Sequence, residues 1–165
     1  MEKAENIVTG LTERFPSIDT QTARVSARQI YLTLPGDVFL DALAYAKDSL
    51  GFSHLCTITG LDNGENFEFI YHMANTEGLT LSLRLVSNRG DGVTIPSVLP
   101  IFNGATFYER EIESLLGVRI EGLPAGRQYP LPDNWPKKQY PMRKDWVLPE
   151  GGVTPEPAEG EDSNG

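Results

Sequence analysis

Residues 106–118, TFYEREIESLLGV, predict a short helix with a start signal and a stop signal. Thr106 is placed to cap the first turn, and Glu109 three residues later completes a capping box. The spacing i, i+4, i+7 and i+8 gives one apolar stripe, formed by Tyr108, Ile112, Leu115 and Leu116. Gly117 follows at the position where a left-handed glycine commonly ends a helix. We therefore expect an amphipathic helix that packs one face against a core.

The segment after this helix differs in composition from the rest of the chain. Between Gly122 and Trp146 there are five prolines and four large aromatic residues, namely Pro124, Pro130, Pro132, Pro136, Pro141, Tyr129, Trp135, Tyr140 and Trp146. Because proline lacks the N–H donor and fixes φ, this composition excludes a helix or a central strand. The segment is also too aromatic for a disordered linker. We predict an extended arm over residues 122–149 that lies against another surface.

The residues before the helix have the patterns of a mixed domain. They predict a helix over residues 1–15, a strand over 28–34, a helix over 37–50, and strands over 54–61, 67–73 and 79–86. Turn sequences separate the last three strands, so these strands predict an antiparallel meander. Residues 93–102 carry no strong signal for either helix or strand.

The order of these elements predicts an α+β fold. We expect a two-layer sandwich of a mostly antiparallel sheet with helices on one face, followed by the C-terminal extended arm rich in proline and aromatic residues. The chain is divided into an α+β body over residues 1–121, a partner-binding arm over 122–149 and a disordered acidic tail over 150–165. The tail contains acidic residues, Gly and Pro but no Lys or Arg.

Charge and cysteine content restrict the possible classes of function. The 165 residues carry a net charge of −9, and the body has no general basic patch for nucleic acid. The single cysteine, Cys56, excludes an internal disulfide and a cysteine-ligated cluster held by this chain alone. The cysteine content and the lack of a signal peptide favour a cytosolic location. No apolar run approaches the ~20 residues that span a bilayer, so we expect membrane association only through partners.

The sequence gives little indication of catalytic or ligand-binding chemistry. His54 and His72 fall on predicted strands without further ligands at metal spacing, so hydrogen-bonded sheet histidines are favoured over a metal site. Cys56 lies two residues from His54, but no third group marks a nucleophilic pair, and we expect a small core residue. Glycine-rich phosphate loops are absent from the sequence. No cofactor is predicted.

Glu109 and Glu113 share one face of the predicted helix, which raises a paired-carboxylate active site as an alternative. Acidic residues in the first turn are favoured by the helix dipole, and Glu109 already has a capping role. Two exposed carboxylates one turn apart repel only weakly, and Arg110 can offset that repulsion. A structural role for this face is therefore favoured over catalysis.

Five of the fourteen basic residues lie in the arm, namely Arg127, Lys137, Lys138, Arg143 and Lys144. Cations interleaved with aromatic rings suit single-stranded nucleic acid, where bases stack on the rings. The same mixture is typical of protein interfaces, which favour Tyr, Trp and Arg anchors. Because an acidic body repels phosphate, we favour a protein partner.

The helix and the arm together resemble the signature region of the C-subunit family of respiratory complex I. The matching segments are FYEREIESLLGV at 107–118, GLP at 122–124, LPDNWP at 131–136 and YPMRKDW at 140–146. Ser114, Leu123 and Gln128 depart from the family pattern, which has an acidic residue, a histidine and an arginine at these positions. The short chain and the LPDNWP segment look more like the counterpart in energy-converting membrane-bound nickel–iron hydrogenases.

The resemblance implies a subunit that binds no cofactor and is not an enzyme by itself. It implies packing against a large subunit with a quinone cavity or a nickel–iron site, contacts with small iron–sulfur subunits, and a position on the cytoplasmic side of the membrane. Partner contacts are expected from Glu109, Arg110, Glu111, Arg127, Tyr129, Trp135, Tyr140, Arg143, Lys144 and Trp146. The alternative is a free-standing nucleic-acid-binding or small enzymatic domain that uses the basic arm or the Glu109/Glu113 face.

Overall fold

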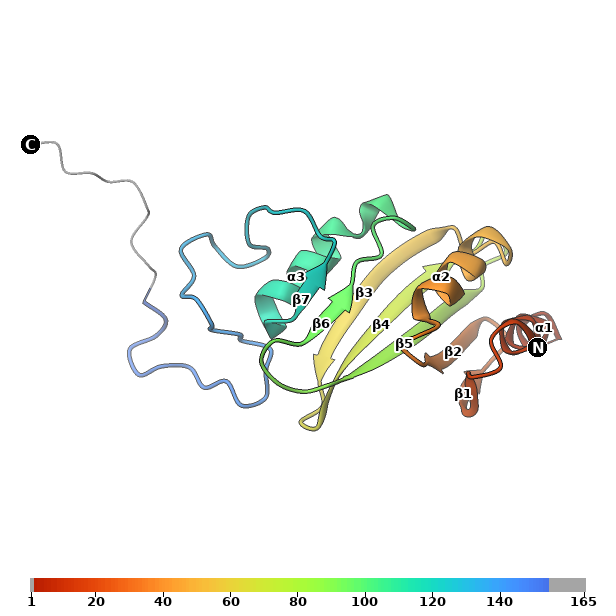
Figure 1. Cartoon of the computed structure of the whole chain (residues 1–165), viewed down its shortest axis with the longest axis horizontal. Coiled ribbons are helices and arrows are strands. Elements are labelled where there is room, and N and C mark those ends of the chain that lie inside the picture. The colour runs from red at the N-terminus through yellow and green to blue at the C-terminus, as the bar shows by residue number, and fades with distance from the viewer. Residues whose placement is uncertain (1, 155–165) are drawn as a thin grey trace, which may run out of the picture.

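The computed structural model describes residues 2–154, so residues 155–165 of the predicted tail lie outside the described part (Figure 1). The elements in chain order are α1 (Glu2–Arg14), β1 (Asp19–Val25), β2 (Gln29–Leu34), α2 (Phe39–Asp48), β3 (His54–Asp62), β4 (Asn66–Ala74), β5 (Thr80–Asn88), β6 (Thr94–Pro96), a 3-10 turn η1 (Asn103–Ala105), α3 (Thr106–Leu116) and β7 (Arg119–Glu121).

Five strands form the main sheet in the order β1-β2-β5-β4-β3. The strands β3, β4 and β5 form the predicted antiparallel meander, and β5 then pairs in parallel with β2. Since α2 connects β2 to β3, the chain crosses the sheet once before it returns to the centre. The sheet is therefore mostly antiparallel, as the sequence predicts.

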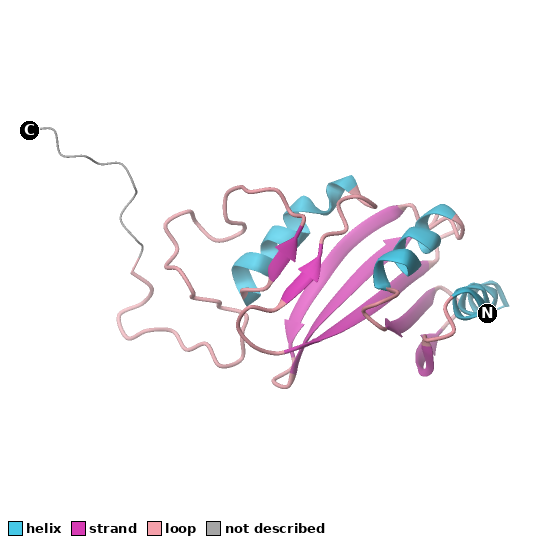
Figure 2. Cartoon of the chain, in the orientation of Figure 1, coloured by secondary structure: helices cyan, strands magenta, loops and turns pink. Residues whose placement is uncertain are grey.

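The helices cover one face of this sheet (Figure 2). Alternate residues of the central strands are buried on that face, namely Ile30, Leu32, Leu34, Phe67, Phe69, Tyr71, Met73, Leu81, Leu83 and Leu85. Helix α2 contacts this layer through Phe39, whose ring lies 4.8 Å from that of Tyr71. The alternating apolar residues of the strands therefore lie on one face of the sheet, under the helices. The result is a two-layer α+β sandwich with one contiguous core.

Helix α3 packs closely on the outer strand β3. At Gly60 of β3, an added Cβ would lie 3.0 Å from Leu116 Cδ1 and 3.1 Å from Ile112 Cγ1. Glycine at this position lets the helix approach the strand. Gly117 ends α3 in the left-handed conformation, with φ 69°, and donates its N–H to Glu113 O. The predicted glycine stop is confirmed, and of the predicted apolar stripe Ile112 and Leu116 are buried whereas Tyr108 and Leu115 are half-buried.

The capping box predicted at Thr106 is wrong. Thr106 is already the first helical residue, the cap position is Ala105, and no side chain caps this end. The cause is η1, a 3-10 turn that runs directly into α3. The Glu109 side chain is consequently directed into the core.

The prediction that Cys56 is a small core residue is also wrong. The pairing of β3 with β4 shifts between Leu55 and Thr57, so Cys56 lies in a bulge and its side chain is exposed. Three strands carry no signal in the sequence. They are β1 and the parallel pair β6 and β7.

Candidate partner-binding site

The arm follows β7 and folds back on its own body, across α3 and the loop after β5 (Figure 1). Residues 122–154 contain no helix or strand, as the proline content predicts. The arm is instead held by side-chain hydrogen bonds and ion pairs at defined points.

The first attachment lies at α3. Arg110 Nη2 donates to Pro124 O at 2.5 Å, and its guanidinium packs so closely on Gly126 that a Cβ there would overlap it. The Tyr129 N–H donates to Ser114 Oγ at 3.2 Å. The Tyr129 ring meets Phe107 edge to face at 5.3 Å between centroids. Ser114, where the family pattern has an acidic residue, therefore serves as an acceptor for the arm.

Both tryptophans are fixed by one glutamine of the arm. Trp135 Nε1 donates to Gln139 O at 2.8 Å, and Trp146 Nε1 donates to Gln139 Oε1 at 2.7 Å. Both tryptophans and Tyr140 are half-buried. An indole N–H that is partly buried needs such an acceptor, so Gln139 allows both rings to pack.

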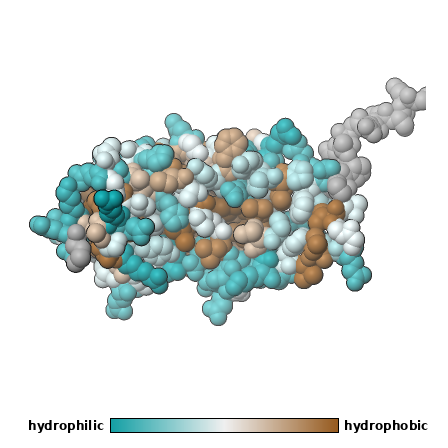
Figure 3. Space-filling view, turned by 180° about the vertical axis from the view of Figure 1, so that it is seen from behind, coloured by the Kyte–Doolittle hydropathy of each residue, from teal (hydrophilic) through white to brown (hydrophobic). Residues whose placement is uncertain are grey.

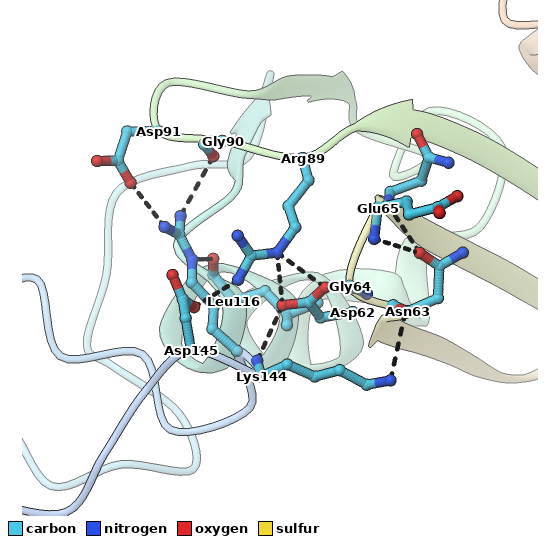
Figure 4. A network of polar contacts seen from close by, with 12 residues as sticks. Asp62, Asn63, Gly64, Glu65, Arg89, Gly90, Asp91, Leu116, Lys144 and Asp145 are labelled. Atoms are coloured by element: carbon cyan, nitrogen blue, oxygen red, sulfur yellow. Dashed lines mark hydrogen bonds and ion pairs between the residues drawn. The ribbon is translucent and has the colours of Figure 1, made fainter.

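The second attachment is a network around Asp62, at the end of β3 (Figure 4). The Asp62 carboxylate is fully buried and accepts from Arg89 Nε at 2.9 Å, from the Gly64 N–H at 2.8 Å and from the Lys144 N–H at 2.9 Å. Arg89 also pairs with Asp145 at 2.5 Å. The closing Arg-Lys-Asp sequence of the arm is thus fastened to the turn after β3 and to the end of β5.

Arg143 joins the arm to the end of α3. Its Nε donates to Leu116 O at 2.7 Å and its Nη1 donates to Asp91 Oδ1 at 2.6 Å. The guanidinium lies 4.6 Å from the Tyr140 ring centroid and 5.4 Å from that of Phe67. A cation that binds the last carbonyl of a helix is favourable with respect to the helix dipole.

The pKa of Asp62 is shifted by the hydrogen bonds that its carboxylate accepts. Burial alone would raise the pKa of Asp62. The backbone N–H groups of Lys144 and Gly64 and the guanidinium of Arg89 together hold the pKa below its usual range. The carboxylate is therefore ionised at neutral pH, and its charge is compensated.

Glu109 shows the opposite behaviour in the core beneath α3. It is 1% exposed, with Ser97 Oγ donating to it at 2.7 Å and the Val98 N–H at 2.6 Å. Burial raises the pKa of Glu109, the two hydrogen bonds oppose that rise, and the nearby Glu113 carboxylate adds to it. Glu109 therefore organises the segment after β6.

Two of the residues predicted to contact a partner, Glu109 and Arg143, bind groups of their own chain, and partner contact at these positions stays a prediction. Glu109 is buried, so its carboxylate and that of Glu113 do not form an exposed pair in this structure. The Arg143 side chain is only 12% exposed and is committed to its own chain. For Glu111, Arg110 and Lys144, and for Arg127 and the aromatic residues of the arm, partner contact stays a prediction.

Sequence reasoning does not identify the acceptors of the arm. It places Asp62 only in a turn and Asp91 only in a loop, and it marks neither Arg89 nor Asp145 for any role. An Asp-Asn-Gly turn has no pattern that marks its aspartate as a buried ion-pair partner. The reason is distance along the chain, because one of the hydrogen bonds to Asp62 joins residues 82 positions apart.

Exposed apolar side chains gather around α3 and the arm. Within residues 2–154, five of the seven large exposed apolar residues belong to this region, namely Phe107, Tyr129, Met142, Val147 and Leu148. Seen from behind, apolar colour gathers at the arm end of the molecule, beside the grey trace, and in a band across the sheet (Figure 3). Because exposed apolar patches on soluble proteins are commonly interaction sites, partner contact at this surface stays a prediction.

The histidines form no metal site in the described part of the chain. His72 shares hydrogen bonds with Ser82 Oγ at 2.9 Å and Thr59 Oγ1 at 3.3 Å, as predicted for a hydrogen-bonded sheet histidine. No group of three or more His, Cys, Asp or Glu side chains with metal-binding geometry occurs among residues 2–154. Over the same range, each helix is too short or too polar to cross a lipid bilayer.

Fold and site together define a class of protein: a small α+β body that carries an aromatic and basic arm, attached to it by hydrogen bonds and ion pairs. The chain belongs to the family described as respiratory-chain NADH dehydrogenase, 30 kDa subunit, whose pattern matches residues 32–151. It is thus a peripheral subunit of the complex I-like, membrane-bound respiratory electron-transfer complexes.

Three relatives illustrate the range of this family. The chain is 29% identical to the C-subunit of F420H2 dehydrogenase from Methanosarcina mazei, over 87% of this chain and 91% of that one. It is 37% identical to the J-subunit of NAD(P)H-quinone oxidoreductase from Synechococcus sp. strain RCC307, over 67% and 66%. A chain in the structure of an archaeal membrane-bound sulfane sulfur reductase matches with a TM-score of 0.79 and 28% identity, over 90% and 88%.

Proposed function

We propose that this chain is a non-catalytic assembly subunit. It docks on the large subunit that carries a quinone cavity or a nickel–iron site, contacts the small iron–sulfur subunits, and meets the membrane only through the complex, on its cytoplasmic side. The redox centres belong to the neighbouring subunits, and this chain contributes contact surface. Within the family, a hydrogenase-type complex stays a prediction, because the relatives named above come from dehydrogenase, quinone oxidoreductase and sulfane sulfur reductase complexes.

One observation carries this proposal: the exposed apolar residues concentrate on α3 and the arm. The arm is already fastened to the body through Arg110 and Asp62, so little entropy is lost when a partner covers it. Three ionisable groups that a catalytic site could use are engaged internally. Asp62, Glu109 and His72 all hold hydrogen bonds inside the body.

The test is co-purification of the complex through a tagged copy of the full chain. Replacing Phe107 and Leu148 by serine removes two exposed apolar groups, and we expect the recovery of partner subunits to fall about tenfold or more. Val25→Ser is the matched control, because Val25 is also exposed but lies on β1, far from α3 in the sheet order. Equal recovery with the double variant and the control would place the docking surface elsewhere.

A further inference from the structure

We propose that the pocket between α3 and the arm receives a carboxylate-bearing segment of a partner protein. This inference rests on the proposed function and specifies the chemistry of the contact. The pocket has a volume of about 300 Å³ and is lined by residues of α3 on one side and of the arm on the other, including Arg110, Arg127, Trp135, Lys137, Lys138 and Tyr140.

The charge of this pocket is opposite to that of the chain. Its lining contains four cationic side chains and a single carboxylate, that of Glu113. The whole chain has a net charge of −9, whereas five Lys or Arg residues against two Asp residues give the arm, residues 122–149, a net charge of +3. A cationic hollow on an acidic protein attracts an anionic group and repels competing cationic surfaces.

Arg110 and Arg127 already have hydrogen-bond partners within the chain. Arg110 uses Nη2 for Pro124 O, and a guanidinium has five N–H donors, so further donors remain for a ligand. Arg127 forms a two-point ion pair with Asp133. Held in this way, the Arg110 guanidinium loses less side-chain entropy when it binds a carboxylate, for which its planar fork is well suited.

Lys138 supplies a positive charge, which favours an anionic ligand over a neutral one. It lines this pocket and the adjacent one, and its φ of 62° lies in the left-handed region that glycine or asparagine adopts more easily. A lysine at such a position costs backbone energy, and the residue borders both pockets. Trp135 and Tyr140 provide the apolar walls that flank a carboxylate side chain.

A protein segment fits better than a nucleic acid. A nucleic acid would bring a continuous run of phosphates across a body whose charge repels them. The cationic hollow also lies beside exposed Tyr129, an apolar anchor that suits a polypeptide interface. The expected occupant is therefore a loop or terminus of a partner subunit that carries Asp or Glu beside apolar residues.

The test is zero-length cross-linking of the assembled complex, purified through the full chain. A water-soluble carbodiimide joins a lysine amine to a contacting carboxylate as an amide, and mass spectrometry identifies the pair. We expect Lys138 to be joined to an Asp or Glu of a partner subunit. Lys3 and Glu77, which pair at 3.1 Å, form the internal control that shows that the reagent has acted.

Two substitutions at Lys138 distinguish the effect of its charge on partner binding from the reactivity of its amine in cross-linking. Lys138→Arg keeps the charge but removes the amine, so the cross-link should disappear while partner recovery stays the same. Lys138→Gln with Arg127→Gln removes both charges, and partner recovery in low salt should fall about two- to fivefold for each charge. Arg28→Gln, an exposed residue outside the arm, is the control for the loss of one charge.

Four results would overturn the inference. One is cross-linking of Lys138 only to acidic residues within 150–165 of its own chain. Another is a Lys3–Glu77 cross-link without any link from Lys138 to a partner carboxylate. The third is salt-dependent binding of a single-stranded oligonucleotide by the purified chain, lost in the double variant. Normal partner recovery with the double variant would defeat this inference alone, whereas failure of the unsubstituted chain to recover partners would defeat the proposed function.

Discussion

Two buried carboxylates show how single residues organise this chain. The negative charge of Asp62 is compensated by three hydrogen-bond donors, and the group is ionised. The Glu109 carboxyl group has only two donors and lies in the apolar core. The pKa of Asp62 is therefore lowered, and that of Glu109 is raised. The direction of each shift follows from whether the donors outweigh the loss of water.

Asp62→Ala should be strongly destabilising. The substitution removes one of the two carboxylate partners of Arg89 and the acceptor of two backbone N–H groups, and the expected loss in free energy of unfolding is about 3 kcal/mol. Urea denaturation followed by circular dichroism measures it. Asp133→Ala, which removes an exposed ion pair with Arg127, is the control and should change stability little. A small effect at Asp62 would mean that this network contributes little to the fold.

Glu109→Gln should stabilise the protein in a pH-dependent way. Glutamine keeps the shape, accepts from the Val98 N–H and can donate to Ser97 Oγ. Because the folded pKa of Glu109 lies above the ordinary value of 4.5, the native residue loses stability as pH rises from 4.5 through the folded pKa. The advantage of the variant should therefore be largest at neutral pH and shrink toward pH 4.5.

Asp62 acts in a separate pH window, so the two effects can be resolved. Its lowered pKa means that its stabilisation is complete above the ordinary value of 3.8 and is lost as pH falls through the folded pKa. Unfolding midpoints of the native chain and of Glu109→Gln, measured from about pH 3 to pH 8, test both directions. A constant difference between the two proteins across this range would contradict the assignment for Glu109.

At the scale of elements, the turn after α3 determines whether the arm can dock. Gly117 is left-handed, with φ 69°, and a Cβ there would overlap the Tyr140 ring. Gly51 is also left-handed, with φ 77°, but no atom lies within 4 Å of an added Cβ. Both glycines adopt a left-handed backbone conformation, but only Gly117 is covered by a side chain, that of Tyr140.

Gly117→Ala should cost more than Gly51→Ala. Each substitution carries a left-handed penalty of about 1 kcal/mol, and Gly117→Ala adds the displacement of Tyr140. In a Tyr140→Ala background the two glycine substitutions should have equal effects on the free energy of unfolding. Denaturant titrations of the single and combined variants give the coupling directly. An excess cost at Gly117 that persists without Tyr140 would mean that the arm does not pack there.

Periodicity predicts most of these elements, since long alternating or helical runs carry their own signal. It predicts α2 and the meander of β3, β4 and β5, within which β4 alternates buried and half-buried residues over all nine positions. It cannot predict β6 and β7, three-residue strands whose pairing joins Ile95 to Ile120. The strand β1 is almost fully exposed, so burial imposes no alternation on its sequence.

The composition of the candidate site can be predicted from the sequence, but its geometry cannot. The basic and aromatic character of the arm is visible in the sequence, and so is its inability to form regular structure. The direction in which each charge points is not, because Arg143 and Asp91 meet only after the arm folds back. Charges in a signature sequence therefore cannot be assigned to a partner before the contacts within the chain are known.

For the whole molecule, the body and the arm differ in what they contribute to stability. Every fully buried residue of the apolar core lies between Ala4 and Ile120, and in the described chain the arm adds only the half-buried Leu123, which packs against this core. The arm is attached by hydrogen bonds and ion pairs instead, through Pro124, Arg143 and Lys144. This difference supports the division at residue 121, which stays a prediction.

A chain that ends at residue 121 should therefore fold. It keeps the core and both strands of the small sheet, but Asp62 and the carbonyl of Leu116 lose donors from the arm. We expect a native far-ultraviolet circular dichroism spectrum and a loss of about 2 kcal/mol in the free energy of unfolding. A chain that ends at residue 149 is the control and should match the full chain. An unfolded 1–121 chain would mean that the arm belongs to the folding unit, in which case variants of the arm could not separate docking from stability.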